Sequence, residues 1–270
     1  MTEKLKRNGA QIKLTRPVRN DSVGIRSFVI ILLMSVLSKP EILKYYKSGN
    51  IVIDPFNSQN LSNASYDVRL GNYFYRQLTL KHTEILNPFH QESLKKMYAN
   101  LEEALPVSEL KSKTNLFQNL KPTDKVILIA PNETILAHTL EFIGGKNGVG
   151  EFPAITSEMR ARSSIGRIGI AVCKCAGWGD IGYINRWTME ITNFSSSTIP
   201  LPVGIRIAQI IFHSTQKIEE KDRYSEKGKY QSSFDLNSLK KRWKPSDMLP
   251  RLYEDRDLGN FSKIVESADL

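Results

Sequence analysis

The sequence is poor in cysteine. Its 270 residues include only Cys173 and Cys175. Two thiols at positions i and i+2 of a strand point to the same face, and a disulfide between them would be strained. The sequence therefore predicts no disulfide scaffold, and a reducing compartment is the default.

Long hydrophobic runs are also lacking. The apolar run Phe28–Met34 is seven residues long, which is too short to span a bilayer. Basic residues precede this run, but no small-residue cleavage site follows it, so a signal peptide is not expected. We predict a soluble, cytoplasmic protein without a membrane partner.

Phosphate-binding glycine motifs of the common kinds are missing as well. The loop at 144–150 holds four glycines, but its spacing is that of neither a dinucleotide fingerprint nor a P-loop, and no strand–loop–helix pattern surrounds it. We therefore predict a plain turn at this loop.

Positive charge is abundant and unevenly spread. The net charge is +10, and residues 1–27 contain seven Lys/Arg against Glu3 and Asp21. Two interpretations of this basic N-terminal extension, residues 1–33, stay open: a solvated tail, or a contact with an acidic partner. Total charge alone does not make nucleic acid the expected partner.

The pattern of elements predicts an all-β domain over residues 34–234. Ser38 and Glu41 form a capping-box pattern at the start of a helix that Gly49 ends. Strands are expected at 51–53, at 65–71 before a turn at Gly71-Asn72, at 73–80, at 125–130, at 134–142 and repeatedly over 154–212. Residues 81–121 interrupt the strands, and leucines at helical spacing over Glu92–Leu105 predict a helical insertion on the surface without chemistry of its own. Residues 235–270 are expected to be a C-terminal extension.

The stretch from Arg160 to Asn193 holds the residues with chemistry. Planar guanidinium groups grip phosphate oxygens in pairs, and the hydroxyls of Ser163 and Ser164 fill remaining acceptor sites. Asp180 follows in a glycine-rich turn, and Glu190 lies in a strand ten residues later. Because side chains alternate along a strand, Glu190 should point away from the apolar face formed by Trp187, Met189 and Ile191. The stretch therefore predicts a nucleotide site.

Six motifs in this order resemble the dCTP deaminases and their trimeric dUTPase relatives, over about residues 34–231. They are Ser-Tyr-Asp-Val-Arg-Leu-Gly (65–71), Arg-Ser-Ser-Ile-Gly-Arg (162–167), Ala-Gly-Trp-Gly-Asp-Ile-Gly-Tyr (176–183), Thr-Met-Glu (188–190), Gly-Ile-Arg-Ile-Ala-Gln (204–209) and Gly-Lys-Tyr-Gln (228–231). The resemblance implies a distorted β jelly-roll (a dUTPase-like barrel) and a homotrimer with active sites at subunit interfaces.

The resemblance also implies residue roles. Glu190 would be the catalytic acid/base, Asp180 would bind the deoxyribose 3′-hydroxyl, and Tyr224 with Lys229 would close over the phosphates. Mg²⁺ would be bound through the triphosphate rather than by protein ligands, and dTTP is a possible feedback ligand. The remaining nucleotide-binding residues implied by the motifs are Arg162, Ser163, Ser164, Ile165, Gly166, Arg167, Thr188, Met189 and Gln209.

The sequence lacks the ligand set of the zinc deaminases. Those enzymes use a His-x-Glu … Pro-Cys-x-x-Cys arrangement, whereas Cys173 and Cys175 have neither that spacing nor the partners. Without zinc, a carboxylate has to carry the protons, and we expect partial burial to raise the pKa of Glu190 for that work.

Some positions depart from the family pattern or select between its activities. Asn185 replaces a glycine, Ser233 replaces a glutamine of the C-terminal flap, and Gly179 replaces an isoleucine, which we expect to loosen the turn. Trp178 and Gln209 resemble the bifunctional enzymes, although Gln209 as a hydrogen-bonded core amide is an open alternative.

We therefore expect deamination of dCTP to dUTP with onward hydrolysis to dUMP and pyrophosphate. The alternatives are a dUTPase alone, or a catalytically inactive binding module on the same fold.

Overall fold

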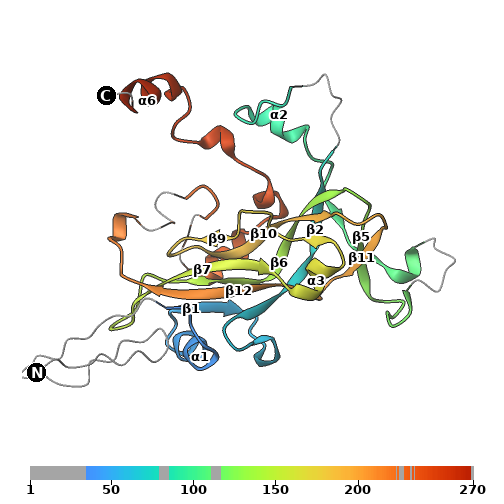
Figure 1. Cartoon of the computed structure of the whole chain (residues 1–270), viewed down its shortest axis with the longest axis horizontal. Helices are drawn as coiled ribbons and strands as arrows, with labels where there is room; N and C mark the ends of the chain where they lie inside the picture. Colours follow the sequence, from blue (N-terminus) through green and yellow to red (C-terminus); the bar gives the residue numbers. More distant parts are fainter. Residues whose placement is uncertain are drawn as a thin grey trace, which may run out of the picture. The chain divides into compact units, whose positions relative to one another are not determined.

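Two antiparallel sheets build the fold over the residues that the computed structural model describes, which are 35–78, 85–110, 117–222, 224, 228–231, 233 and 235–268. The larger sheet has the order β8-β10-β6-β2-β12-β7-β9, with β1 also pairing with β6 and β3 with β2 (Figure 1). Its strands are β1 (Ile51–Asp54), β2 (Tyr66–Arg76), β3 (Glu102–Glu103), β6 (Thr134–Gly145), β7 (Ala154–Ala161), β8 (Ile170–Ala171), β9 (Trp178–Gly179), β10 (Ile184–Asn193) and β12 (Arg206–Thr215).

The smaller sheet pairs β11 (Ile199–Pro202), β5 (Lys125–Ile129) and β4 (Leu105–Pro106). The helices are few and short. They are α1 (Lys39–Lys47), α2 (Gln91–Lys95), α3 (Ser163–Arg167), α5 (Leu236–Arg242) and α6 (Phe261–Ala268), with 3-10 turns η1 (Ser58–Asn60), η2 (Val107–Glu109), η4 (Glu220–Asp222), η5 (Pro245–Met248) and η6 (Leu252–Glu254). The predicted all-β, distorted jelly-roll architecture is confirmed.

Residues Met34–Leu270 form one compact unit. The basic extension predicted at residues 1–33 lies outside the described residues. No helix in the described part of the chain is long and apolar enough to cross a membrane.

The N-terminal helix begins as its sequence predicts. The Oγ and the backbone N–H of Ser38 both donate to the Glu41 carboxylate, at 2.8 and 3.0 Å, which caps α1. After α1, Gly49 has a φ of +77°, in the left-handed region that glycine tolerates best. The chain then turns directly into β1, which begins at Ile51.

The turn predicted at Gly71-Asn72 is wrong, because β2 runs unbroken from Tyr66 to Arg76. The reason lies in the neighbouring strand β6. A Cβ atom at Gly71 would come within 2.0 Å of the His138 ring, so the missing side chain makes room for this imidazole. The pairing of β2 with β6 shifts register between Leu70 and Phe74 at the same place. Gly71 therefore marks a close approach of two strands rather than a turn.

The insertion contains a helix, but the predicted span Glu92–Leu105 is wrong beyond Lys95, where α2 ends. Glu102 and Glu103 pair with Phe74 and Tyr73 of β2, and Leu105 pairs with Val126 of β5. Backbone pairing with available strand edges therefore overrides the helical spacing of the leucines.

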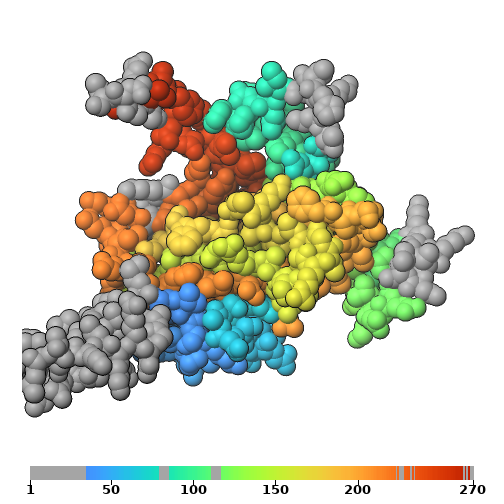
Figure 2. Space-filling view, in the orientation of Figure 1, coloured from blue at the N-terminus to red at the C-terminus, as the bar shows by residue number. Residues whose placement is uncertain are grey.

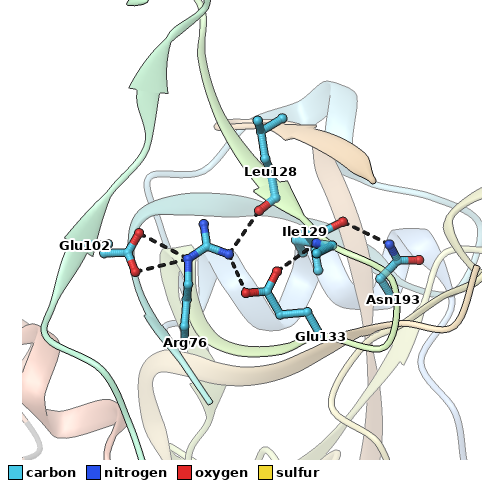
Figure 3. A network of polar contacts seen from close by, with 7 residues as sticks. Arg76, Glu102, Leu128, Ile129, Glu133 and Asn193 are labelled. Atoms are coloured by element: carbon cyan, nitrogen blue, oxygen red, sulfur yellow. Dashed lines mark hydrogen bonds and ion pairs between the residues drawn. The ribbon is translucent and has the colours of Figure 1, made fainter. Parts of the chain in front are cut away.

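A polar network ties the insertion to the sheet (Figure 3). The guanidinium of Arg76, in β2, donates to both carboxylate oxygens of Glu102 at 3.1 and 3.2 Å and to Glu133 at 2.5 Å. It also donates to the backbone oxygen of Leu128 at 3.2 Å. Glu133 in turn accepts from the backbone N–H of Ala130 at 2.7 Å. One side chain thus joins β2, β3 and the β5–β6 turn.

We expect Arg76→Met to lower the free energy of unfolding by roughly 2 kcal/mol, because it leaves two carboxylates without their partner at a half-buried site. Urea denaturation measures the change. The control is Lys95→Met, which removes an exposed pair with Glu92 and should cost less than about 0.5 kcal/mol. Equal losses for the two variants would contradict a supporting role for Arg76.

Candidate active site

Strand β10 presents one polar face to a cavity. Trp187, Met189 and Ile191 are 4%, 0% and 0% exposed and belong to the core, whereas Thr188 and Glu190 on the other face are only half-buried. The predicted alternation is confirmed. Glu190 is held in place by the pairing of β10 with β6, where it lies opposite Leu136.

The cavity has a volume of about 420 Å³. It brings together four residues that the sequence predicts at the nucleotide site: Asp180 and the pair Thr188 and Glu190, from two of the motifs, and Tyr224. Trp178, Tyr183, Arg186 and Trp187 are further wall residues from the turn before β10 and from β10 itself.

Burial raises the pKa of Glu190 above its usual range, while a backbone hydrogen bond and the charge of Lys174 oppose that rise. Its Oε2 atom is buried, and no hydrogen-bond partner lies near it among the described residues. A buried carboxylate oxygen without a donor is costly when ionised. Glu190 is thus prepared to hold a proton and to interact with a group that enters the cavity.

Asp180 stands between this cavity and a second hollow of about 490 Å³. Its backbone oxygen accepts from Tyr183 N at 3.0 Å, which closes the turn. Gly179 was expected to loosen this turn, but it lets the turn pack closely against Trp187. A Cβ atom at Gly179 would lie 2.4 Å from the Trp187 ring. These contacts hold the backbone of the turn that carries the exposed Asp180.

The second hollow is lined by oxygen-bearing side chains, among them Thr156, Asp180, Thr215 and Asp222. Oxygen ligands are those that Mg²⁺ prefers, and this ion usually keeps several waters and binds through phosphates with one or two carboxylates. The donor set therefore fits Mg²⁺ carried by a triphosphate. The described residues contain no group of three or more His, Cys, Asp or Glu side chains placed to hold a metal ion by themselves.

The Gly-Lys-Tyr-Gln motif is bound to the start of β10. Gln231 accepts from Ile184 N at 2.6 Å and donates to Gly182 O at 2.8 Å. Asn185, a departure from the family pattern, donates to the backbone oxygen of Tyr230 at 2.9 Å. The asparagine therefore supports the motif.

The two predicted flap side chains lie differently. Tyr224 lines the Glu190 cavity, packs edge-on against Tyr183 at 5.0 Å and has its pKa raised to about 12, chiefly by burial. Lys229 forms an ion pair with Asp255 at 3.1 Å and lines a different hollow. Only Tyr224 is thus brought to the cavity within one chain.

The predicted phosphate motif forms α3 and its entry, and none of its residues lines the Glu190 cavity. Ser163, Ser164, Gly166 and Arg167 are exposed, and Ile165 is buried. Arg162 binds the buried Asp67 at 3.2 Å, a carboxylate that also binds Arg206 at 3.0 Å.

Two more predicted residues lie outside the cavity. Met189 is fully buried in the core. Gln209 is half-buried in β12, where it lies opposite Asp67 and Arg160. Gln209 is therefore only half-buried, whereas the open alternative was an amide buried in the core. Gln209 belongs to the same surface as the phosphate motif.

A third hollow, of about 830 Å³, is lined by Gly166 of this motif and by Arg160 before it. Trp178, which is 60% exposed, lines this hollow and the Glu190 cavity alike. The two hollows therefore share this tryptophan as a wall.

Sequence reasoning missed several cavity residues. Tyr98 comes from the insertion, for which the sequence predicted no chemistry, and it lines the cavity. The 3-10 turn η5 and its neighbours contribute the others. They are Trp243, Asp247, Met248 and Pro250. In the sequence these residues stood out only as scattered aromatic and apolar residues within a C-terminal stretch of mixed charge.

Comparisons with known proteins identify the family to which this chain is similar. A family model described as dCTP deaminase-like matches residues 36–215. A protein named dCTP deaminase, dUMP-forming, from Methanopyrus kandleri is 31% identical over 201 residues, which make up 73% of this chain and 91% of that protein. One of the same name from Hydrogenobaculum is 32% identical over 185 residues, 68% of this chain and 84% of that protein.

A crystal structure of 2′-deoxycytidine 5′-triphosphate deaminase from Agrobacterium tumefaciens aligns with a TM-score of 0.45 at 15% identity, over 67% of this chain and 49% of that one. The family model alone spans well over half of the sequence. The chain belongs to the dCTP deaminase-like family.

Proposed function

We propose that this protein deaminates dCTP to dUTP by hydrolysis and cleaves the product onward to dUMP and pyrophosphate. Relatives over most of the chain are named dCTP deaminase, dUMP-forming. The observation that carries the proposal is Glu190, a half-buried carboxyl with an unpartnered buried oxygen, in one cavity with Asp180.

In the deamination step Glu190 works as both base and acid. It takes a proton from water as the oxygen attacks C4 of the cytosine, and it passes this proton to the ring nitrogen N3. It then takes the remaining proton of the new C4 hydroxyl and gives it to the amino group, so ammonia leaves and a carbonyl remains. Glu190 ends in its starting state, and its raised pKa favours such proton transfer near neutral pH.

In the hydrolysis step Asp180 positions water for attack at the α-phosphorus, and pyrophosphate is the leaving group. Mg²⁺ bound to the triphosphate supplies neutralising charge. The Arg-Ser-Ser motif would hold the phosphates from a neighbouring subunit, because within one chain these side chains do not line the Glu190 cavity. A homotrimer with shared sites is thus part of the proposal, as is dTTP as a feedback ligand.

The test is incubation with dCTP and Mg²⁺, with the nucleotides separated by ion-exchange chromatography. We expect dUMP and pyrophosphate with ammonia released in equal amount. Accumulation of dUTP would leave a deaminase alone. Conversion of dUTP but not of dCTP would leave a dUTPase, and no turnover of either nucleotide would favour the inactive binding module.

A further inference from the structure

The C-terminal segment beyond the flap motif builds one end of the Glu190 cavity. It lies outside the part of the chain that the family model matches. Trp243, Met248 and Pro250 of this segment line the cavity together with Tyr98 of the insertion. In Figure 2 the insertion (teal) and the C-terminal segment (red) lie on the same side of the molecule.

This segment is firmly anchored. Leu239 of α5 is buried against Phe142 and Ile184, and Met248 is buried against Tyr75 and Leu136. Polar contacts add to this packing. Arg251 binds Asp247 at 2.9 Å and the backbone oxygen of Lys229 at 2.9 Å, and Lys240 binds Asp54 at 2.6 Å. The segment is therefore a fixed wall.

Arg186 of β10 meets this wall. The guanidinium carbon lies 4.7 Å from the centre of the Trp243 ring and 5.1 Å from that of Phe142. Aromatic faces attract the flat guanidinium and leave its N–H donors pointing outward in its own plane. Trp243 thereby fixes the direction in which Arg186 can donate.

One of these donors has no acceptor among the described residues. The Nε atom of Arg186 is buried, and the described residues offer it no acceptor. A buried donor without a partner destabilises a fold. Arg186 also lines the cavity, so an entering ligand is the natural source of the missing acceptor.

The cavity brings this donor together with the predicted catalytic carboxyl. Arg186, Thr188 and Glu190 of β10 all line it, and the pairing of β10 with β6 shifts register between Arg186 and Thr188. A cytosine presents its 4-amino group, a donor, on one side and its 2-oxo group, an acceptor, across the ring. The cavity offers a carboxyl group and a guanidinium, which complement these two ends in acceptor and donor character.

We propose that Arg186, oriented by Trp243, is a specificity-determining residue that donates to the 2-oxo edge of the pyrimidine whose C4 lies at Glu190. This assignment rests on the proposed function, because it takes the ligand to be a cytosine nucleotide. Arg186 contacts the base directly, and Trp243 is a positioning residue that acts through Arg186.

The test measures binding by calorimetry without Mg²⁺ in a Glu190→Gln background, so that dCTP is not deaminated during the measurement. Adding Arg186→Gln should weaken dCTP binding roughly 10- to 100-fold and leave the binding of inorganic tripolyphosphate unchanged. The parent should also prefer dCTP to 2-thio-dCTP, because sulfur is a weak acceptor, and Arg186→Gln should abolish that preference. Trp243→Ala should reproduce both losses, whereas Trp243→Phe, which keeps an aromatic face, should restore most of the binding.

The matched control is Lys241→Gln, which removes an exposed positive charge from α5 and should change none of these values. Unchanged dCTP binding in the Arg186→Gln variant would overturn the assignment. An equal loss of tripolyphosphate binding would also overturn it, because Arg186 would then bind the phosphates rather than the base. A chain that converts no dCTP would overturn the proposed function itself. Conversion of dCTP with no effect of Arg186→Gln would overturn the assignment alone.

Discussion

Glu190→Gln is expected to lower the rate of dCTP deamination by roughly 10³-fold, within the range that general acid–base groups contribute. Glutamine keeps the size of the side chain but can neither take nor return a proton. Burial raises the pKa of the Glu190 carboxyl group, which suits this group to the proton work. The measurement is ammonia release from dCTP under saturating Mg²⁺.

Two controls separate a catalytic effect from a damaged fold. Hydrolysis of dUTP by Glu190→Gln should continue, because that step uses Asp180 and the phosphate-binding groups. Glu92→Gln, at an exposed pair on α2, should leave both activities unchanged. Full-rate deamination by the Glu190 variant would remove this residue from the mechanism.

The same substitution should alter stability in a pH-dependent way. Because burial raises the pKa of Glu190 in the folded state, folding favours its protonated form, and this contribution is present in acid and is lost as pH rises through the raised pKa. Glutamine is neutral throughout. The variant should therefore unfold at higher temperature than the parent at about pH 8 and at the same temperature at about pH 4.

The sequence was a good guide wherever one local rule decided the outcome. The capping box at Ser38, the start of β1 and the alternation of Glu190 against Trp187 each depend on residues within a few positions of one another. These elements form as predicted because no distant contact competes with them.

Distant contacts explain what the sequence missed. Gly71 looks like a turn residue, and only its neighbour His138, on another strand, shows why β2 passes straight through it. The leucines after Lys95 keep helical spacing, but strand edges of β2 and β5 lie within reach and take the backbone instead. The pattern of residues along the chain carries no information about neighbours that come from distant strands.

The candidate site also has residues that the sequence predicted and residues that it missed. Asp180, Thr188, Glu190 and Tyr224 meet in one cavity as the motif order implied. Trp243 and Met248 could not be assigned to it, because a mixed-charge tail carries no signal for the wall on which it packs. Only the tertiary structure places these residues at the cavity.

His138 should make the fold sensitive to acid. Burial, aided by the charge of Arg186, lowers its pKa from 6.5 to about 4. The backbone N–H of Tyr73 donates to its Nε2 at 3.3 Å, so the ring proton is on Nδ1, which lies 2.8 Å from the backbone oxygen of Thr139. A second ring proton would face the Tyr73 N–H and would add charge beside Arg186 and the Trp243 ring, which is 4.7 Å away.

The direction of the effect follows from this depressed pKa. Below about pH 6.5 the unfolded chain binds a proton at this residue, whereas the folded chain does not. The free energy of unfolding therefore decreases as the pH is lowered from about 6.5 to about 4. The loss from this one group amounts to roughly 3 kcal/mol, at about 1.4 kcal/mol for each pH unit. Urea unfolding across this range should show the slope. His138→Gln, which can still accept from Tyr73 and donate to Thr139, should remove that part of it.

The exposed His90 provides the matched control, since His90→Gln removes an imidazole without touching a buried hydrogen bond and should leave the slope as it is. An unchanged slope in His138→Gln would mean that this imidazole accepts its second proton in the folded chain. The ring would then have to leave the space that Gly71 keeps open for it. That movement would also disturb Trp243 and with it the wall beside Arg186, so in that case dCTP binding by the folded chain should weaken as the pH is lowered.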